Sequence, residues 1–150
     1  GIVIDHILSG ENPEEIRRHM IMIRKVMALD GLKGGEWVSQ GSGGFYKGII
    51  FRPGFFSLDH KAIKRLAAVA PGCTLNIIEN GKVTKKIKTK MPPRIYNFDD
   101  LMCTNEACIS NDTQSENVGA MFIRTSDNNF RCAYCGRVHS FKEIFKSKDK

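Results

Sequence analysis

The apolar positions near the start of the chain first follow the spacing of a strand and then that of a helix. Residues 2–8 are rich in β-branched side chains, which favours a strand. Asn12, Pro13 and Glu15 form a typical helix start, with asparagine as the N-cap and proline at the first helical position. The apolar residues that follow recur at spacings of four, three and four, as on one face of a helix: Ile16, Met20, Ile23 and Met27.

The alternation of strands and helices continues through the first two thirds of the chain. Four more segments have strand character, namely residues 36–39, 46–51, 74–78 and 82–87. Asn80 and Gly81 lie between the last two and predict a tight hairpin turn. Ser57 is expected to cap a second helix. This order predicts an α+β fold, a ferredoxin-like split βαβ domain whose antiparallel sheet gains an extra strand and carries both helices on one face.

Two adjacent prolines, Pro92 and Pro93, interrupt this pattern, because proline cannot donate to a strand ladder. We expect a domain boundary just after them and two domains, residues 1–96 and 97–150. The second domain is expected to be small and mostly β. A domain of that size needs support beyond its apolar core, such as a bound metal.

Four cysteines in the second domain are spaced like the ligands of a structural metal site. Cys103 and Cys108 frame a C-x4-C turn, and Cys132 and Cys135 frame a C-x2-C turn. Four thiolates complete a tetrahedral zinc site that leaves no open position for catalysis. Two disulfides, unrelated thiols and a rubredoxin-like iron site are the alternatives. The fifth cysteine, Cys73, enters an apolar stretch and is expected to be a buried, unreactive thiol.

Positive charge is concentrated in the first domain. Residues 1–96 carry 16 Lys and Arg against 8 Asp and Glu, whereas residues 97–150 carry 7 against 8. A zinc module that grips nucleic acid is usually the basic part, so this distribution argues against nucleic acid as a partner. No apolar run is long enough to span a membrane and no leader pattern is visible, so we expect a cytoplasmic protein without membrane contact.

The sequence lacks the common catalytic motifs. It has no G-x-x-x-x-G-K-[ST], G-x-S-x-G or H-E-x-x-H pattern, and we expect no enzymatic activity. His19 and His60 are expected to face solvent from the two helices. Asp5 and His6 are polar residues inside an apolar strand. Such residues either meet water at the edge of a sheet or form the lip of a ligand pocket.

Lysines crowd the strand expected at residues 82–87. Lys86 and Lys88 share one face of that strand, and Lys85 points to the other. Such a strand is either an edge that lysines protect against aggregation or the rim of a phosphate-binding site.

These segments together resemble the regulatory chain of aspartate carbamoyltransferase, the nucleotide-sensing partner of the enzyme that commits carbon to pyrimidine synthesis. The resemblance rests on residues 1–7, 70–80 and 93–97 and on the two cysteine turns, residues 103–110 and 132–135. It implies a non-catalytic regulatory subunit. Its N-terminal domain would bind the effectors ATP, CTP or UTP and pair with a second copy, and its zinc domain would dock onto the catalytic chain.

The resemblance also assigns residues to each of these roles. The nucleotide would be bound by Val3, Asp5, His6, Arg52, Asn76, Ile78, Val83 and Lys86. Lys86 would meet the phosphates, together with Arg52 in the place of a family lysine. Asn105 and Tyr134 would belong to the interface with the catalytic chain.

The middle of the chain departs from the family pattern. Between Gly10 and Gly54 the match nearly vanishes, and Gly54 stands where the family has glutamate. In the zinc domain, Ala107 and Gly136 replace an asparagine and a glutamate. The alternatives are therefore an assembly protein whose effector site is lost and a zinc-ribbon protein that binds nucleic acid.

Overall fold

The computed structural model describes residues 1–54, 58–98, 100–111 and 118–145. The chain divides into two units, Gly1–Lys90 and Met91–Lys150. The division falls before the boundary that we expected after Tyr96. The reason is that residues 94–96 form a strand, and this strand pairs with the sheet of the second unit.

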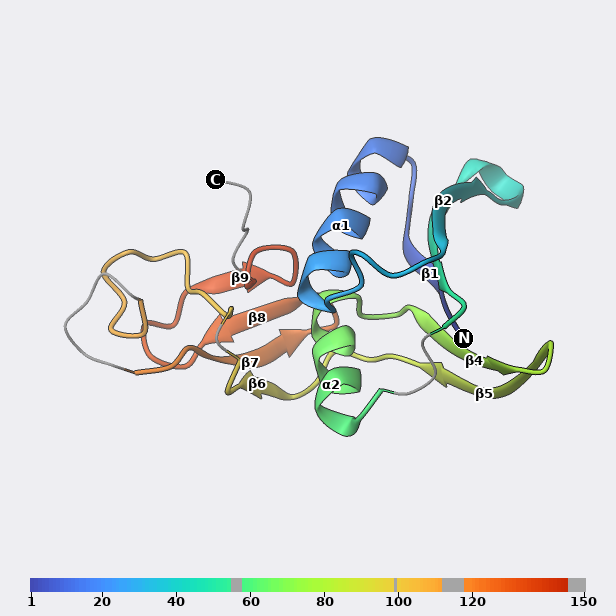
Figure 1. Ribbon diagram of the computed structural model, residues 1–150. Coiled ribbons are helices and arrows are strands. Elements are labelled where there is room, and N and C mark those ends of the chain that lie inside the picture. Colours follow the sequence, from blue (N-terminus) through green and yellow to red (C-terminus); the bar gives the residue numbers. More distant parts are fainter. Residues whose placement is uncertain (55–57, 99, 112–117, 146–150) are drawn as a thin grey trace. The chain divides into compact units, whose positions relative to one another are not determined.

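The first unit is built on a five-stranded antiparallel sheet (Figure 1). Its elements are β1 (Ile2–Gly10), α1 (Pro13–Val26), β2 (Gly35–Gln40), the 3-10 turn η1 (Ser42–Gly44), β3 (Tyr46–Arg52), α2 (His60–Val69), β4 (Thr74–Glu79) and β5 (Lys82–Lys88). The strand order β2-β3-β1-β4-β5 confirms the α+β fold predicted from the sequence, with β5 as the added strand.

Both helices lie on one face of this sheet, and α1 packs against β1, β2, β3 and α2 (Figure 1). The side chains between the two layers are almost fully buried and form the core: Ile2, Ile4, Ile16, Ile23, Ile50, Leu66 and Leu75. The opposite face of the sheet, which we call the open face, carries the residues that alternate with this core, such as Val3 on β1 and Asn76 on β4.

Both helices begin with an N-cap residue, and for α2 this residue differs from the one that we expected. The side chain of Asn12 accepts hydrogen bonds from the amides of Glu14 and Glu15, which confirms the predicted start of α1. The N-cap of α2 is Asp59, whose carboxylate accepts from the Ala62 amide. Ser57, the expected cap, lies outside the described residues.

The hairpin between β4 and β5 turns at Asn80 and Gly81, as predicted. Both residues have positive φ, 52° and 75°, which is the geometry that favours asparagine followed by glycine. His19 corrects another expectation, because only 4% of it is exposed and its Nε2 lies 2.5 Å from the Val69 carbonyl oxygen. Hydrogen bonding to α2 allows this polar ring to be buried on the inner face of α1.

The second unit contains a four-stranded antiparallel sheet. Its strands are β6 (Arg94–Tyr96), β7 (Met121–Ser126), β8 (Asn129–Cys132) and β9 (Val138–Ser140), in the order β6-β7-β8-β9. Phe122 and Phe130 are fully buried in its core and meet edge to face. Among the helices of the described ranges, none has both the length and the apolar character needed to cross a bilayer.

Candidate metal centre and nucleotide-binding surface

The four predicted cysteines converge on one point in the second unit. The sulfur atoms of Cys103, Cys108, Cys132 and Cys135 all lie within 4.8 Å of one another. The Sγ atoms of Cys103 and Cys135 are 3.6 Å apart, and those of Cys108 and Cys132 are 3.7 Å apart. Four sulfurs at about 2.3 Å from one tetrahedral ion would be separated by about 3.8 Å. The cluster therefore fits a structural zinc ion and leaves no ligand position for a substrate.

Disulfides do not fit this geometry. All five cysteines are free, and the sulfur separations are far longer than the roughly 2 Å of a disulfide bond. Burial raises the pKa of the Cys103 and Cys132 thiols. Partial burial would also raise the pKa of the Cys135 thiol. Hydrogen bonds from the Arg137 backbone, Asn105 and the neighbouring thiols outweigh this effect and lower that pKa to about 7. A zinc ion bound here would displace the thiol protons, so binding should weaken as the pH falls.

The first cysteine turn is held by its own polar residues. The side-chain oxygen of Asn105 accepts from the Ala107 amide at 3.1 Å, and its carbonyl oxygen accepts from the Cys108 amide at 3.0 Å. The Ser110 hydroxyl lies 3.1 Å from the Cys108 sulfur. Asn105, predicted to meet a partner, therefore also shapes the turn. Tyr134, the other predicted contact, is 40% exposed beside Cys135.

Two more residues close to the cysteines were not singled out by the sequence. His139, on β9, is 1% exposed, and burial lowers its pKa. Its Nε2 lies 3.1 Å from the amide nitrogen of Thr104, next to the ligand Cys103. The side-chain nitrogen of Asn111 donates to the Cys103 carbonyl oxygen at 3.0 Å. No sequence signal identified them, because neither belongs to a metal-ligand spacing.

Most of the predicted nucleotide-binding residues gather on the open face of the first unit. Val3 pairs with Asn76, and Asn76 pairs with Lys86, so these three side chains form one row across β1, β4 and β5. Ile78 lies two residues beyond Asn76 and pairs with Val83 at the end of the hairpin. The result is an apolar and amide-lined strip with a lysine beside it.

Asp5 and His6 lie at the end of this strip, where β1 leaves β4. Asp5 pairs with Thr74 as the last ladder position between the two strands. His6 is exposed and has a φ of 58°, within an irregular stretch of the pairing between β1 and β3. The Asp5 carboxylate forms an ion pair with Lys47 Nζ at 3.2 Å and accepts from the His6 amide at 2.7 Å. The polar pair therefore sits on the central strand β1 and not on an edge strand of the sheet.

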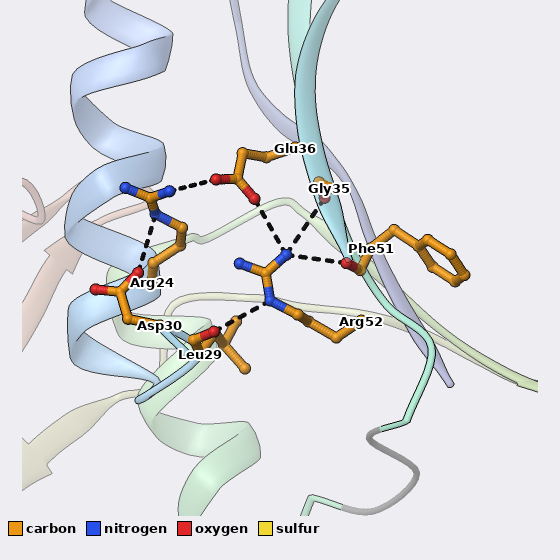
Figure 2. A network of polar contacts seen from close by, with 7 residues as sticks. All are labelled: Arg24, Leu29, Asp30, Gly35, Glu36, Phe51 and Arg52. Carbon is orange, nitrogen blue, oxygen red and sulfur yellow. Dashed lines mark hydrogen bonds and ion pairs between the residues drawn. The ribbon is translucent and has the colours of Figure 1, made fainter. Parts of the chain in front are cut away.

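Arg52 does not join these residues, contrary to the prediction from the family resemblance. It is 4% exposed and lies on the side of the sheet that the helices cover. Figure 2 shows its guanidinium pointing away from the Phe51 ring and into a network of polar contacts. Because alternate residues of a strand face opposite sides, Phe51, which pairs with Val3, is the β3 residue on the open face.

The guanidinium nitrogens of Arg52 donate several hydrogen bonds within this network. Nε donates to the Leu29 carbonyl at 3.1 Å, and Nη1 donates to the Phe51 carbonyl at 2.9 Å and to the Glu36 carboxylate at 3.1 Å (Figure 2). Glu36 also forms an ion pair with Arg24 of α1. Partial burial would raise the pKa of Glu36, but the hydrogen bonds and charges of both arginines outweigh it and lower that pKa. We assign Arg52 to the structure of the first unit and not to a phosphate site.

Comparison with known families matches both units in turn. The family model described as the allosteric domain of the aspartate carbamoyltransferase regulatory chain matches residues 1–90. The model described as the metal binding domain of the same regulatory chain matches residues 93–145. The metal binding match includes all four cysteines and the strands β6 to β9.

Curated relatives give the same picture over nearly the whole chain. Protein PyrBI of Treponema denticola is 56% identical over 150 residues, and these cover 99% of this chain and 28% of that protein. Protein PyrBI of Thermotoga maritima is 42% identical over 97% of this chain and 27% of its own length. The aspartate carbamoyltransferase regulatory chain of Aeropyrum pernix is 30% identical over 96% of this chain and 88% of its own length. The chain thus spans little more than a quarter of the PyrBI proteins and most of the separate regulatory chain.

Proposed function

Because the chain belongs to the family of aspartate carbamoyltransferase regulatory chains, we propose that it is a non-catalytic regulatory subunit that binds a nucleoside triphosphate in its first unit and a catalytic chain through its zinc unit. The observation that carries the proposal is the match of the allosteric and metal binding models to the two units in their order along the chain. The regulated catalytic chain would act in pyrimidine biosynthesis, in the cytoplasm.

The chemistry of the open face supports nucleotide binding there. Val3, Ile78 and Val83 offer apolar contact to a base, and the Asn76 amide can both donate to and accept from its polar edge. Asp5 can accept hydrogen bonds from ribose hydroxyls, with His6 next to it. Lys86, and Lys88 two residues further along β5, place positive charge on the same face for the phosphates.

Calorimetric titration of the full chain with ATP, CTP and UTP tests this site. We expect heat of binding with at least one of the three and a weaker affinity at higher salt, because cations hold the phosphates. Lys86→Ala should cost about 1.5–3 kcal/mol of binding free energy, the usual value of a charge-assisted hydrogen bond. Asp5→Ala should change the preferred base more than the overall affinity.

Lys85→Ala is the matched control for Lys86→Ala. Lys85 carries the same charge on the same strand but pairs with Ile77, on the face that the helices cover. Its substitution should leave the affinity nearly unchanged. If no triphosphate gives heat at millimolar concentration while the zinc unit stays folded, the effector site is lost and the chain is an assembly protein.

We propose that docking onto the catalytic chain uses the surface of the zinc unit near Asn105 and Tyr134. Tyrosine is enriched at interface centres, and Tyr134 presents its ring at the surface. Co-purification with an aspartate carbamoyltransferase catalytic chain should weaken strongly for Tyr134→Ala. The control is Val138→Ala, because Val138 is 58% exposed on β9 of the same unit. Equal recovery of both variants would place the interface elsewhere.

We further propose that the first unit pairs with a second copy of itself. Trp37 is 49% exposed on β2, which lies at one end of the sheet order, and an edge strand with a large exposed aromatic side chain is suited to self-association. Light scattering during size-exclusion chromatography should find a dimer and, for Trp37→Ser, a larger fraction of monomer.

A further inference from the structure

His139 has one tautomer defined by its surroundings. Its Nδ1 lies 3.1 Å from the carbonyl oxygen of Arg137. A carbonyl oxygen can only accept a hydrogen bond, so Nδ1 carries the proton and donates. In a neutral imidazole the other nitrogen, Nε2, then has no proton and acts as an acceptor. The ring is therefore prepared to receive a hydrogen bond at Nε2.

Thr104 supplies donors to this nitrogen. Its backbone N–H lies 3.1 Å from Nε2, and its hydroxyl oxygen lies 2.9 Å from the same atom. Cys103 Sγ is 3.7 Å from Nε2, and a zinc-bound Cys103 thiolate facing an unprotonated Nε2 leaves this contact without a proton for a hydrogen bond. Since His139 is absent from the group of side chains whose ligand atoms all lie within 4.8 Å, it is a neighbour of the metal site and not one of its ligands.

The other end of the same peptide group is held by Asn111. Its side-chain nitrogen donates to the carbonyl oxygen of Cys103 at 3.0 Å and reaches the carbonyl oxygen of Asn105 at 3.4 Å. The peptide group between Cys103 and Thr104 is thus bonded at its carbonyl oxygen by Asn111 and at its N–H by His139. In sequence, Asn111 follows the first cysteine turn and His139 follows the second.

We propose that His139 and Asn111 are positioning residues of the four-cysteine centre, which clamp the Cys103–Thr104 peptide and thereby fix the direction of the Cys103 sulfur. The inference rests on the metal site described above. A peptide held at both ends cannot rotate to turn Cys103 away from the other three sulfurs, so the ligand set stays assembled during brief openings of the site. The clamp also ties the first cysteine turn to β9, beyond the second turn. Its predicted effect is slow release of zinc.

His139→Phe tests the clamp with little change in packing. Phenylalanine keeps an aromatic ring against Phe122, whose ring centroid lies 5.3 Å from that of His139, but it cannot accept from Thr104. In the zinc-loaded full chain, we expect unchanged circular dichroism and transfer of zinc to a coloured chelator about 10- to 100-fold faster, the factor by which loss of an outer-shell partner usually lowers metal affinity. Asn111→Ser should accelerate release in the same way.

His139→Gln is the conservative variant and Val138→Ala the control. The glutamine amide oxygen can accept from Thr104, so His139→Gln should recover part of the slow release, and Val138→Ala should release zinc at the wild-type rate. In the cobalt-substituted chain, His139→Phe should alter the shape of the d–d bands while the thiolate charge-transfer bands remain. If His139→Phe does not fold, His139→Gln and Asn111→Ser are compared with Val138→Ala in the same way.

Two results would overturn the inference in different ways. Release rates and cobalt spectra equal to wild type in the folded His139 and Asn111 variants would mean that the peptide needs no clamp, while the metal site itself stands. A wild-type chain that retains no zinc would remove the metal site and the clamp together.

Discussion

Arg52 places a full positive charge inside the first unit, where several elements meet around it. Its guanidinium donates to the Leu29 carbonyl in the segment after α1, to the Glu36 carboxylate on β2 and to the Phe51 carbonyl on β3. Removing one partner of a buried ion pair leaves the others without compensation and usually costs more than the pair itself contributes. Arg52 thus links β3 by hydrogen bonds to the segment that leads into β2.

Arg52→Met should destabilise the first unit by about 2–3 kcal/mol, somewhat below the usual 3–5 for a buried pair because Glu36 is partly exposed. Arg17→Met is the control, since the Arg17 pair with Glu14 is exposed on α1 and such pairs contribute about 0.5 kcal/mol or less. Urea unfolding of both variants measures the difference. Equal midpoints would show that the network does not stabilise the fold.

Glu36 gives the same network a dependence on pH. Because the pKa of Glu36 is lowered in the folded chain, its contribution to stability is complete above the pKa of the unfolded state, about 4.3. It is lost as the pH falls further, through the lower folded pKa. The stability gap between wild type and Glu36→Gln should therefore stay constant well above about pH 4.3 and shrink as the pH falls below that value. A gap independent of pH in urea titrations would contradict the assignment.

At the scale of elements, the entry into β2 depends on one glycine. Gly34 has a φ of 145°, and a Cβ built there would lie 1.9 Å from the Phe51 carbonyl oxygen, a backbone atom that cannot move without disturbing β3. Gly10 ends β1 with nothing within 4 Å of the same added atom and no positive φ. The two glycines therefore differ both in backbone conformation and in whether their surroundings leave room for a side chain.

Gly34→Ala should lower the unfolding free energy by about 3 kcal/mol or more, because strain and overpacking act together. Gly10→Ala should change it by less than about 1 kcal/mol. Thermal unfolding followed by circular dichroism compares the two. A Gly34→Ala variant as stable as Gly10→Ala would mean that the segment before β2 packs less closely against β3 than described.

The elements themselves could largely be predicted from the sequence, because their signals are local. The asparagine cap of α1 and the Asn80-Gly81 turn each depend on residues within a few positions. Pairing across the sheet is not local. The family resemblance grouped Arg52 with the residues of the open face, whereas the pairing of β3 puts it on the other face, because a shift of one residue along a strand reverses the side chain. His19 was misplaced because its partner, Val69, lies fifty residues away in α2.

In the two sites as well, residues could be predicted from the sequence when their partners lie close to them in sequence. The cysteines were found because each pair of ligands is close in sequence, and short spacings leave little freedom for the sulfurs. The clamp of Asn111 and His139 could not be found, because it needs the two cysteine turns to be placed against each other. The row of Val3, Asn76 and Lys86 followed from family resemblance, and strand pairing shows that the three share one face.

At the scale of the whole molecule, the two units differ in what holds them together. The first has a sheet covered by two helices, whereas the second combines a small sheet with a four-sulfur cluster. A small unit of this kind obtains much of its folding free energy from the bound metal. Chelation should therefore unfold Met91–Lys150 and leave much of Gly1–Lys90 folded.

Hydrogen exchange followed by mass spectrometry measures the outcome of chelation segment by segment. We expect β7 and β8 to lose protection after zinc removal and β1, β3 and β4 to keep most of theirs. Elemental analysis of the same sample should find about one zinc per chain before chelation. Iron in its place would favour the rubredoxin-like alternative, and uniform loss of protection in both units would show that they fold as one.

The proposed regulatory role is tested most directly by the effect of nucleotides on an assembled complex. An aspartate carbamoyltransferase catalytic chain would be assayed alone, with this chain, and with the Lys86→Ala variant, each across a titration of ATP, CTP and UTP. We expect that at least one nucleotide changes the reaction rate with the wild-type chain, has no effect on the catalytic chain alone and has a reduced effect with Lys86→Ala. A complex that forms fully and whose rate responds to none of the three nucleotides would contradict it.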